Sequence, residues 1–299
     1  MSTLKGWIQA SRLPSQSYIF FPILLGQAIY YSQTSRFSLN VFLLLHLYGL
    51  FLQLFIVYAN DRADIATDRL NTTYTMFSGG SRTLVTGLIT IRENCVAVIT
   101  VVVLNAAVGL ALTALYQRTL ALPLIAFSLG LLWMYSFPPV RLSYRGAGEI
   151  LQMLGVGLVL PVFGYYGQSG SFNGFPVHLL AFILPCQLAC AMCTALPDEP
   201  SDRTSSKRTA AVLLGLPLAK LIVIILIGTS LAFFLLLSPA LLQHTLAVLA
   251  LPMLCFTGIL VLRKTSPPGS KRLNLFVTCA VGANVLLMAG AALMFFQLN

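Results

Sequence analysis

Apolar runs of helix length divide the chain and predict a bundle of membrane-spanning helices. Each run has about 20 residues, the length that an α-helix needs to cross the hydrocarbon core of a bilayer. The runs are continuous, whereas a membrane-spanning β-strand shows only about ten residues of alternating hydrophobicity. We mark nine segments, with limits near 15–33, 39–58, 92–115, 119–137, 148–167, 176–196, 211–237, 242–262 and 273–298.

The predicted fold class is an all-α polytopic membrane protein, a bundle of nine transmembrane helices. Short connections join most segments, so neighbouring helices should run antiparallel, and we expect residues 1–299 to form a single transmembrane domain. Composition supports this class, because 58% of the residues are hydrophobic and 9% are charged. A soluble domain is about a quarter charged.

The positive charges predict the orientation of the bundle. Cytoplasmic loops carry an excess of Lys and Arg, and a cytoplasmic N-terminus puts fifteen of the eighteen basic residues on that side. All eight acidic residues fall on the same side, which predicts a cytoplasmic polar cap over the bundle. We expect the inner (plasma) membrane of a bacterium as the location, with the N-terminus and the active site in the cytoplasm. The net charge of +10 then reflects membrane orientation and indicates no nucleic-acid partner.

The first chemically distinctive stretch follows the second apolar segment. It has the pattern Asn60-Asp61-x-x-Asp64-x-x-x-Asp68-Arg69. On a helix, Asn60, Asp64 and Asp68 share one face because each is four residues from the next. Carboxylates at membrane depth are costly and are by default functional. Three oxygen ligands on one face predict a bound cation.

A second acidic stretch, Asp198-Glu199-x-x-Asp202-Arg203, follows the sixth segment. The two stretches stand at the same side of the bundle and can face each other. Hard carboxylate oxygens suit Mg²⁺, which keeps several waters and bridges to phosphate oxygens. Neighbouring Arg and Lys side chains supply charge-assisted hydrogen bonds to the same phosphates. Together the stretches predict a site for a Mg²⁺-diphosphate.

Two prolines distinguish the second stretch from the first. Pro200 cannot donate the backbone hydrogen bond of a regular helix, and Pro197 suits the first turn of a new one. Either the sixth helix breaks near residue 197 or another helix begins there. The spacing of Asp198 and Asp202 therefore does not guarantee a shared face, and Glu199 is an alternative ligand.

The pair of motifs resembles that of the UbiA superfamily of intramembrane prenyltransferases, in which NDxxDxxxD is followed much later by DxxxD. Other stretches are also similar to this family, namely Arg12-Leu-Pro-Ser-Gln-Ser, Ser78-Gly-Gly-Ser-Arg82, Tyr135-Ser-Phe-Pro-Pro-Val-Arg141, Gly146-Ala-Gly-Glu149 and Lys207-Arg-Thr. The resemblance covers most of residues 10–215. The last three helices agree only in number and hydrophobicity.

The resemblance implies a role for each matching residue. The ligands of Mg²⁺ on the diphosphate would be Asn60, Asp64, Asp68, Asp198 and Asp202. The further contacts to the diphosphate would come from Asp61, Arg69, Arg82, Lys207 and Arg208. The residues near the reacting centre would be Tyr135 and Arg141, with the four aspartates of the two motifs as the rest of the catalytic set.

The predicted function is Mg²⁺-dependent transfer of a polyprenyl group from an allylic polyprenyl diphosphate to an aromatic acceptor in quinone biosynthesis. Metal and guanidinium groups neutralise the departing diphosphate, and an apolar chamber keeps water from the allylic cation. We favour dihydroxynaphthoate, the acceptor of the menaquinone pathway, on the similarity of the 79–82 loop and the second motif. The alternative is 4-hydroxybenzoate or another lipid-soluble acceptor.

A cation-coupled membrane transporter is the competing class of function. A transporter places ionisable groups near mid-membrane or in broken central helices. Here the acids lie at one membrane edge beside Arg and Lys, which repel a bare cation but attract a metal-diphosphate. A phosphatidyltransferase would carry two closely spaced motifs, whereas Asp64 and Asp198 are 134 residues apart.

Two ionisable residues have open roles. Glu149 either orients or deprotonates the acceptor, or caps the start of a helix. Lys220 lies within the seventh apolar segment, where we expect its side chain to extend to the membrane surface; lining of the cavity is the alternative.

Overall fold

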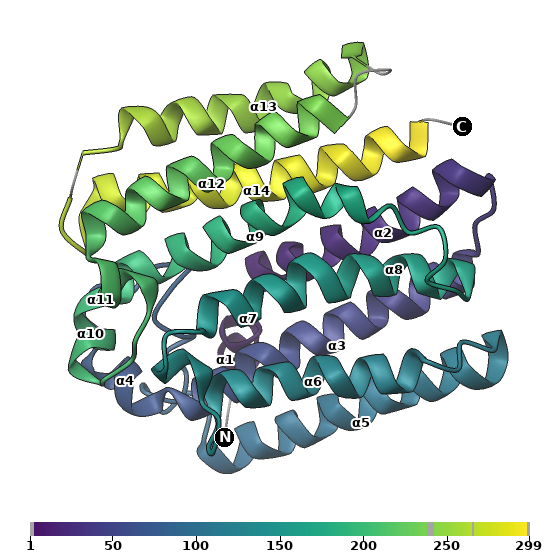
Figure 1. Ribbon diagram of the computed structural model, residues 1–299. Helices are drawn as coiled ribbons and strands as arrows, with labels where there is room; N and C mark the ends of the chain where they lie inside the picture. The colour runs from purple at the N-terminus through teal and green to yellow at the C-terminus, as the bar shows by residue number, and fades with distance from the viewer. Residues whose placement is uncertain (1–2, 238–241, 265, 298–299) are drawn as a thin grey trace.

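A computed structural model describes residues 3–237, 242–264 and 266–297, and the described chain is helical throughout its regular elements (Figure 1). Long helices run side by side across the molecule. They are α2 (Ser17–Thr34), α3 (Leu39–Ala63), α5 (Ile91–Tyr116), α6 (Ala121–Ser136), α7 (Gly148–Leu154) continued by η3 (Gly155–Val159) and α8 (Leu160–Ser169), α9 (Leu180–Ala195), α12 (Leu216–Leu237), α13 (Leu242–Val261) and α14 (Lys271–Gln297).

The nine predicted apolar segments all fall on helices within the described residues. By length and composition, six described stretches can cross a membrane: Leu39–Ala63, Ile91–Tyr116, Gly148–Ser169, Val177–Thr204, Leu216–Leu237 and Lys271–Gln297. Ala121–Ser136 and Thr245–Val261 are apolar but shorter. The structure therefore supports a helical membrane protein.

One predicted segment is divided in two. We expected a continuous helix over 211–237, but α11 (Ala210–Leu214) ends at Gly215 and α12 begins at Leu216. Gly215 has a φ of +75°, a conformation that residues with a side chain rarely adopt. The expectation was wrong because the apolar run continues through a residue that terminates the first helix.

Short helices gather at one end of the bundle, on the left in Figure 1. They are α1 (Leu4–Ala10), η1 (Leu13–Gln16), α4 (Ile65–Leu70), η2 (Leu142–Tyr144), η5 (Leu196–Asp198), α10 (Glu199–Thr204) and α11, whereas η4 (Val177–Leu179) precedes α9 at the other end. At the first end, α4 contacts α10. The bundle thus brings the two acidic stretches together, although four long helical segments separate them in the sequence.

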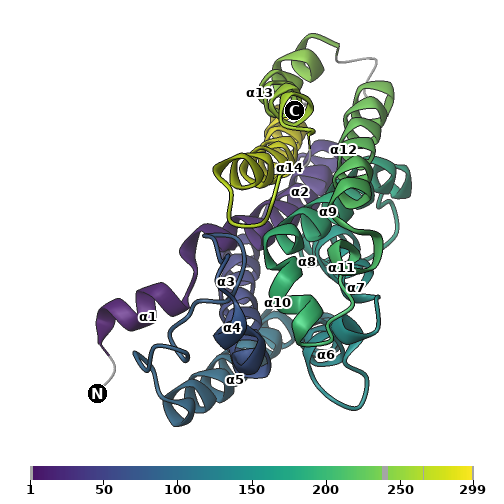
Figure 2. The same ribbon diagram turned by 90° about the vertical axis from the view of Figure 1, so that its left-hand side faces the viewer.

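Helix α2 lies at the centre of the bundle, between α14 and α3 in both views (Figures 1 and 2). Its closest approach is to α8, where an added Cβ on Gly26 would lie 1.9 Å from the carbonyl oxygen of Pro161. An added Cβ on Gly164 of α8 would lie 2.3 Å from the carbonyl oxygen of Ile23. The two backbones are in direct contact, so only glycine fits at either crossing point.

Lys220 does not extend to the membrane surface, and our expectation for it was wrong. Its side chain on α12 is 1% exposed and donates hydrogen bonds of 2.8 Å to the carbonyl oxygens of Leu262 and Lys264. These carbonyls follow the end of α13, where backbone oxygens lack partners within the helix. Packing of α12 against α13 therefore gives this lysine a structural role outside the cavity described below.

Candidate active site

The first acidic motif spans a break between two helices. Helix α3 ends at Ala63, Asp64 has φ −99° and ψ 9°, and α4 begins at Ile65. The helical hydrogen bonds nevertheless continue, from Asp64 N–H to Asn60 O (2.9 Å) and from Asp68 N–H to Asp64 O (2.8 Å). The four-residue spacing therefore still directs Asn60, Asp64 and Asp68 into one cavity.

The second motif is also broken, as its prolines predicted. Helix α9 ends at Ala195, Pro197 lies in the first turn of η5, and Pro200 lies in the first turn of α10. Asp198 and Asp202 line the same cavity as the first motif. Glu199 accepts a 2.7 Å hydrogen bond from Arg203 Nε and is not part of the cavity wall.

The cavity has a volume of about 260 Å³ and a wall that changes character along the helices. Ile56 and Leu52 line it one and two turns before Asn60 on α3, and α6 contributes Leu131 and Leu132 before Tyr135. Other apolar residues of the wall include Ile19, Leu151, Val156 and Leu160. The acidic motifs thus cover one end of a chamber whose remaining wall is largely apolar.

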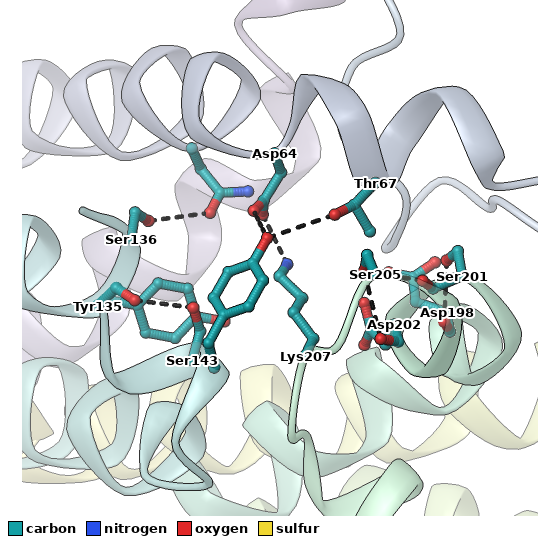
Figure 3. Close-up of polar contacts among 12 residues, drawn as sticks. Asp64, Thr67, Tyr135, Ser136, Ser143, Asp198, Ser201, Asp202, Ser205 and Lys207 are labelled. Atoms are coloured by element: carbon teal, nitrogen blue, oxygen red, sulfur yellow. Dashed lines mark hydrogen bonds and ion pairs between the residues drawn. The ribbon is translucent and has the colours of Figure 1, made fainter. Parts of the chain in front are cut away.

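Lys207 forms an ion pair with Asp64 in the centre of the polar end (Figure 3). The Nζ–Oδ2 distance is 2.6 Å, and the two side chains are only 11% and 4% exposed. Burial lowers the pKa of the Lys207 ammonium, but Asp64, Tyr135 and Asp202 raise it more, so the pKa lies well above its ordinary value. Lys207 therefore remains charged.

The loop from Asn71 to Arg82 joins the two motifs. Asn71 Nδ2 donates to Asp198 Oδ1 at 2.6 Å, and the Gly79 N–H donates to Asp198 Oδ2 at 2.9 Å. Thr73 Oγ1 donates to the carbonyl oxygen of Pro197 at 2.6 Å. Asn71 is a site residue that the sequence analysis missed, because no motif spacing relates it to a residue 127 positions away.

Asp61 and Arg82 contact this loop by hydrogen bonds and do not line the cavity. The Asp61 carboxylate accepts hydrogen bonds from the N–H of Ser81 (3.1 Å) and from the Ser81 hydroxyl. Arg82 Nη1 donates to the carbonyl oxygens of Asp68 and Asn71. Both predicted diphosphate contacts are thus directed at the protein backbone and at neighbouring side chains.

Three other predicted residues lie outside the cavity wall. Arg69 and Arg208 are exposed. The guanidinium carbon of Arg141 lies 3.5 Å from the centroid of the Tyr144 ring, and the Tyr144 hydroxyl is 3.4 Å from Asp64 Oδ1. Arg141 therefore reaches the site only through Tyr144, a residue that the sequence analysis did not single out.

Arg12 lines the cavity although we assigned it no role. It precedes η1 in a left-handed conformation, with φ 45°. Its position directly before the first apolar segment was the available signal. Tyr135 lines the cavity as well, and its carbonyl oxygen accepts a 2.8 Å hydrogen bond from the Ser143 hydroxyl (Figure 3).

Crowded carboxylates give the site an unusual charge state. Burial, and then the neighbouring Asp64 and Asp61, raise the pKa of the Asp68 carboxyl to about 7, although Lys207 opposes them. Lys207 is the only cation that forms an ion pair with these acids in the described residues. A further positive charge would therefore stabilise the ionised site.

The oxygen donors fit Mg²⁺ in a hydrated, substrate-bridged form. Among the described residues, no group of three or more His, Cys, Asp or Glu side chains is close enough to hold an ion alone. Mg²⁺ usually binds through one or two carboxylates, several waters and substrate phosphates. Facing aspartates from α3–α4 and η5–α10 meet that requirement, with room between them for phosphate oxygens.

Known proteins are similar to this chain in sequence. The chain matches the UbiA prenyltransferase family over residues 19–280. It is 27% identical over 217 residues to 2-carboxy-1,4-naphthoquinone phytyltransferase of Synechocystis sp., and the alignment covers 72% of this chain and 67% of that protein.

Two solved structures have a similar fold. A UbiA homologue from Archaeoglobus fulgidus bound to GPP and Mg²⁺ superposes with a TM-score of 0.67 at 18% identity, covering 98% of this chain and 99% of that chain. The apo UbiA homologue from Aeropyrum pernix has a TM-score of 0.65 at 19% identity, covering 93% and 96%. Because the matched region of residues 19–280 includes both acidic motifs and nearly the whole bundle, this chain belongs to the UbiA prenyltransferase family.

Proposed function

We propose that this protein uses Mg²⁺ to transfer a polyprenyl group from an allylic polyprenyl diphosphate to an aromatic acceptor. The observation that supports this function is the cavity itself, which joins two acidic motifs and Lys207 to a long apolar wall. A charged diphosphate with a hydrocarbon tail requires both environments in one chamber. The solved homologue bound to GPP and Mg²⁺ adds support.

The polar end would bind and activate the diphosphate. Asn60, Asp64 and Asp68 would hold Mg²⁺ from one side and Asp198 and Asp202 from the other. The bound ion would neutralise charge on the departing diphosphate. Lys207 is directed into the same space by Asp64 and would donate a charge-assisted hydrogen bond to a phosphate oxygen.

The apolar wall would bind the prenyl tail and exclude water. Leu52, Ile56 and Leu132 bury hydrocarbon that would otherwise contact water. An allylic carbon that becomes positive as diphosphate leaves reacts with any water present, so a dry wall favours the acceptor. Tyr135 lies between the two regions of the wall and would face the reacting carbon.

Dihydroxynaphthoate is our proposed acceptor, which assigns the protein to menaquinone biosynthesis. The relative from Synechocystis sp. is named for transfer to a carboxylated naphthoquinone, a bicyclic acid of the same ring system. We also propose that nine helices cross the inner membrane of a bacterium, with the acidic motifs at the cytoplasmic side.

An assay in lipid nanodiscs tests the reaction and the acceptor. Purified protein receives Mg²⁺, radiolabelled farnesyl diphosphate and either 1,4-dihydroxy-2-naphthoate or 4-hydroxybenzoate. We expect a labelled, lipid-soluble product with the naphthoate. Product with the benzoate alone would overturn the acceptor assignment, and no product with any aromatic acceptor would overturn the function.

Substitutions in the same assay test the metal ligands. Asp64→Asn and Asp202→Asn should each lower turnover by about 10²-fold or more, the usual effect of removing one electrostatic contact to a developing charge. Glu199→Gln is the matched control, because Glu199 lies in the same stretch but pairs with Arg203 outside the cavity. Activity of Asp64→Asn within twofold of wild type would contradict the assignment.

A further inference from the structure

Glu149 is a buried carboxylate in the cavity wall that the diphosphate site does not use. It is 8% exposed, lies in the first turn of α7 and lines the cavity. Neither of the ion pairs among the described residues includes it. An ionisable group at membrane depth without an opposite charge is costly and is by default functional.

The two oxygens of Glu149 differ in their surroundings. Oε1 accepts a 2.6 Å hydrogen bond from the N–H of Ala210, the first residue of α11. Within the described chain, Oε2 accepts no hydrogen bond from any other residue. The Ala210 contact therefore fixes the carboxylate while leaving one oxygen for a ligand in the cavity.

Polar groups from three elements surround this carboxylate. Gln152 lies one helical turn further along α7 and lines the same wall. Thr209 precedes Ala210 and also lines the cavity, where its buried hydroxyl lies beside the Asp202 carboxyl. The Tyr135 ring packs against Gly148, the residue before Glu149, where an added Cβ would lie 3.0 Å from Tyr135 Cε2.

The carboxylates of the motifs are engaged elsewhere. Asp64 Oδ2 is paired with Lys207, and both oxygens of Asp198 accept hydrogen bonds from the 71–79 loop. Asp68 and Asp202 face the space that we assign to Mg²⁺ and diphosphate. Glu149 is the cavity carboxylate whose free oxygen lies outside that assignment.

We propose that Glu149 is the general base that deprotonates the acceptor, with Gln152 and Thr209 as the other polar groups of the acceptor subsite. This inference rests on the proposed function, since it names the group that binds the acceptor hydroxyl in that reaction. A hydroxylated aromatic ring fits these groups because a carboxylate accepts a hydrogen bond from its O–H. The amide and the hydroxyl hold its other oxygens.

The proposed step balances in atoms and charge. Oε2 of Glu149 takes the proton of the acceptor hydroxyl, and the electron pair of that O–H bond forms a carbonyl. The ring double bond at that carbon opens, and its electron pair forms a bond from the adjacent ring carbon to the first carbon of the prenyl chain. The allylic C–O bond breaks, and its electron pair leaves with the diphosphate. The products of this step are a prenylated dienone, protonated Glu149 and diphosphate.

A purely structural role for Glu149 is separable by substitution. As the acceptor for the first N–H of α11, the carboxylate resembles a helix cap, and Ala at this position would lose both roles. Glu149→Gln keeps an amide oxygen for the Ala210 N–H but cannot take a proton. This variant therefore retains the structural contact and removes only the proposed base.

The test measures acceptor chemistry and diphosphate binding in parallel. For Glu149→Gln in nanodiscs, we expect prenylation turnover to fall by about 10²-fold or more, the usual contribution of a general base. Mg²⁺-dependent binding of farnesyl diphosphate should stay within twofold of wild type. The rise of wild-type kcat/KM with pH on its acid limb should disappear in the variant, whereas the control Glu199→Gln should behave as wild type.

Other results would overturn the inference. Prenylation by Glu149→Gln within threefold of wild type excludes a base at this position, and parallel loss of diphosphate binding indicates a structural role. If wild-type protein binds farnesyl diphosphate but prenylates no aromatic acceptor, the proposed function has failed, independently of Glu149. If Glu149→Gln does not fold, Gln152→Leu decides: we expect a higher KM for the acceptor only, and an unchanged acceptor KM overturns the subsite.

Discussion

At the scale of single residues, the charge of the site follows from how closely its carboxylates are placed. Asp64 and Asp68 are one helical turn apart, and both are buried. Lys207 is directed at Asp64, so Asp68 has like charges nearby without a partner of its own. Burial first, and these like charges second, raise the pKa of the Asp68 carboxyl to about 7. The same like charges explain why a divalent ion suits the site.

This pKa predicts how pH and Mg²⁺ act together on stability. The Asp68 pKa is raised from 3.8 to about 7 in the folded protein, so its protonated form stabilises the fold at acidic pH. That contribution is lost as pH rises through 7. Without divalent ions, the melting temperature should fall between pH 6 and pH 8. Added Mg²⁺ should stabilise more at pH 8, because the ion binds the deprotonated carboxylate.

Thermal denaturation with and without Mg²⁺ at both pH values checks this prediction. Asp68→Asn removes one titrating carboxyl and should reduce the difference between the two values. Equal stabilisation by Mg²⁺ at pH 6 and pH 8 in the wild-type protein would contradict it.

At the scale of elements, the 71–82 loop connects the two halves of the site. Its contacts to Asp198 come from the Asn71 side chain and the Gly79 backbone. Helices α4 and α10 each have only six residues and are too short to be stable alone. The loop therefore determines how far apart the two acidic motifs lie.

Asn71→Ala removes the side-chain contact to Asp198 and should let the two acidic motifs move apart. We expect the KM for the prenyl diphosphate to rise by about tenfold or more, because groups that orient metal ligands typically contribute 10- to 100-fold. Thr72→Ala is the matched control, since Thr72 is the next residue and its side chain is exposed. Steady-state kinetics at saturating acceptor measure the effect, and an equal KM for the two variants would disagree with this role of the loop.

The contact between α2 and α8 is the second prediction at this scale. Gly26→Ala would place a methyl group 1.9 Å from the Pro161 carbonyl oxygen, so the helices must separate. The expected loss of stability is about 1–3 kcal/mol, typical of an overpacked core. Gly130→Ala on α6 meets no atom within 4 Å and should be neutral or stabilising. Thermal unfolding in one detergent compares the two, and equal melting temperatures would argue against the close contact.

At the scale of the whole molecule, most charged residues lie at one end of the bundle. The loops that carry both motifs, the 137–147 connection and the N-terminal helix lie together there (Figure 1). The connection between α2 and α3 lies at the opposite end. This arrangement agrees with the positive-inside pattern of the sequence and puts the polar end of the cavity at one end of the bundle.

Cysteine labelling tests the orientation that we propose. Thr204 and Asn40 are exposed at opposite ends of the bundle, whereas the six native cysteines are buried or half-buried. In intact cells, a membrane-impermeant maleimide should label Asn40→Cys and should label Thr204→Cys only after permeabilisation. The opposite pattern would reverse the topology, and wild-type protein supplies the background.

Local properties of the sequence were enough to predict the helices and the two motifs. The length of an apolar run and its flanking charges are set by residues that are close in sequence. The helix break near residue 197 is also local, because Pro197 and Pro200 restrict the backbone at their own positions. The four-residue spacing of Asn60, Asp64 and Asp68 likewise survived the end of α3 because the helical hydrogen bonds continue.

Only the tertiary structure decided which side chains reach the cavity. Arg82 and Asp61 belong to the sequence motifs, but in the folded protein their side chains form hydrogen bonds with residues of the 71–82 loop. Asn71 gained its partner Asp198, and Glu149 gained Ala210, from elements remote in sequence. The direction of a side chain depends on the packing of distant helices, a property that spacing along the chain does not contain.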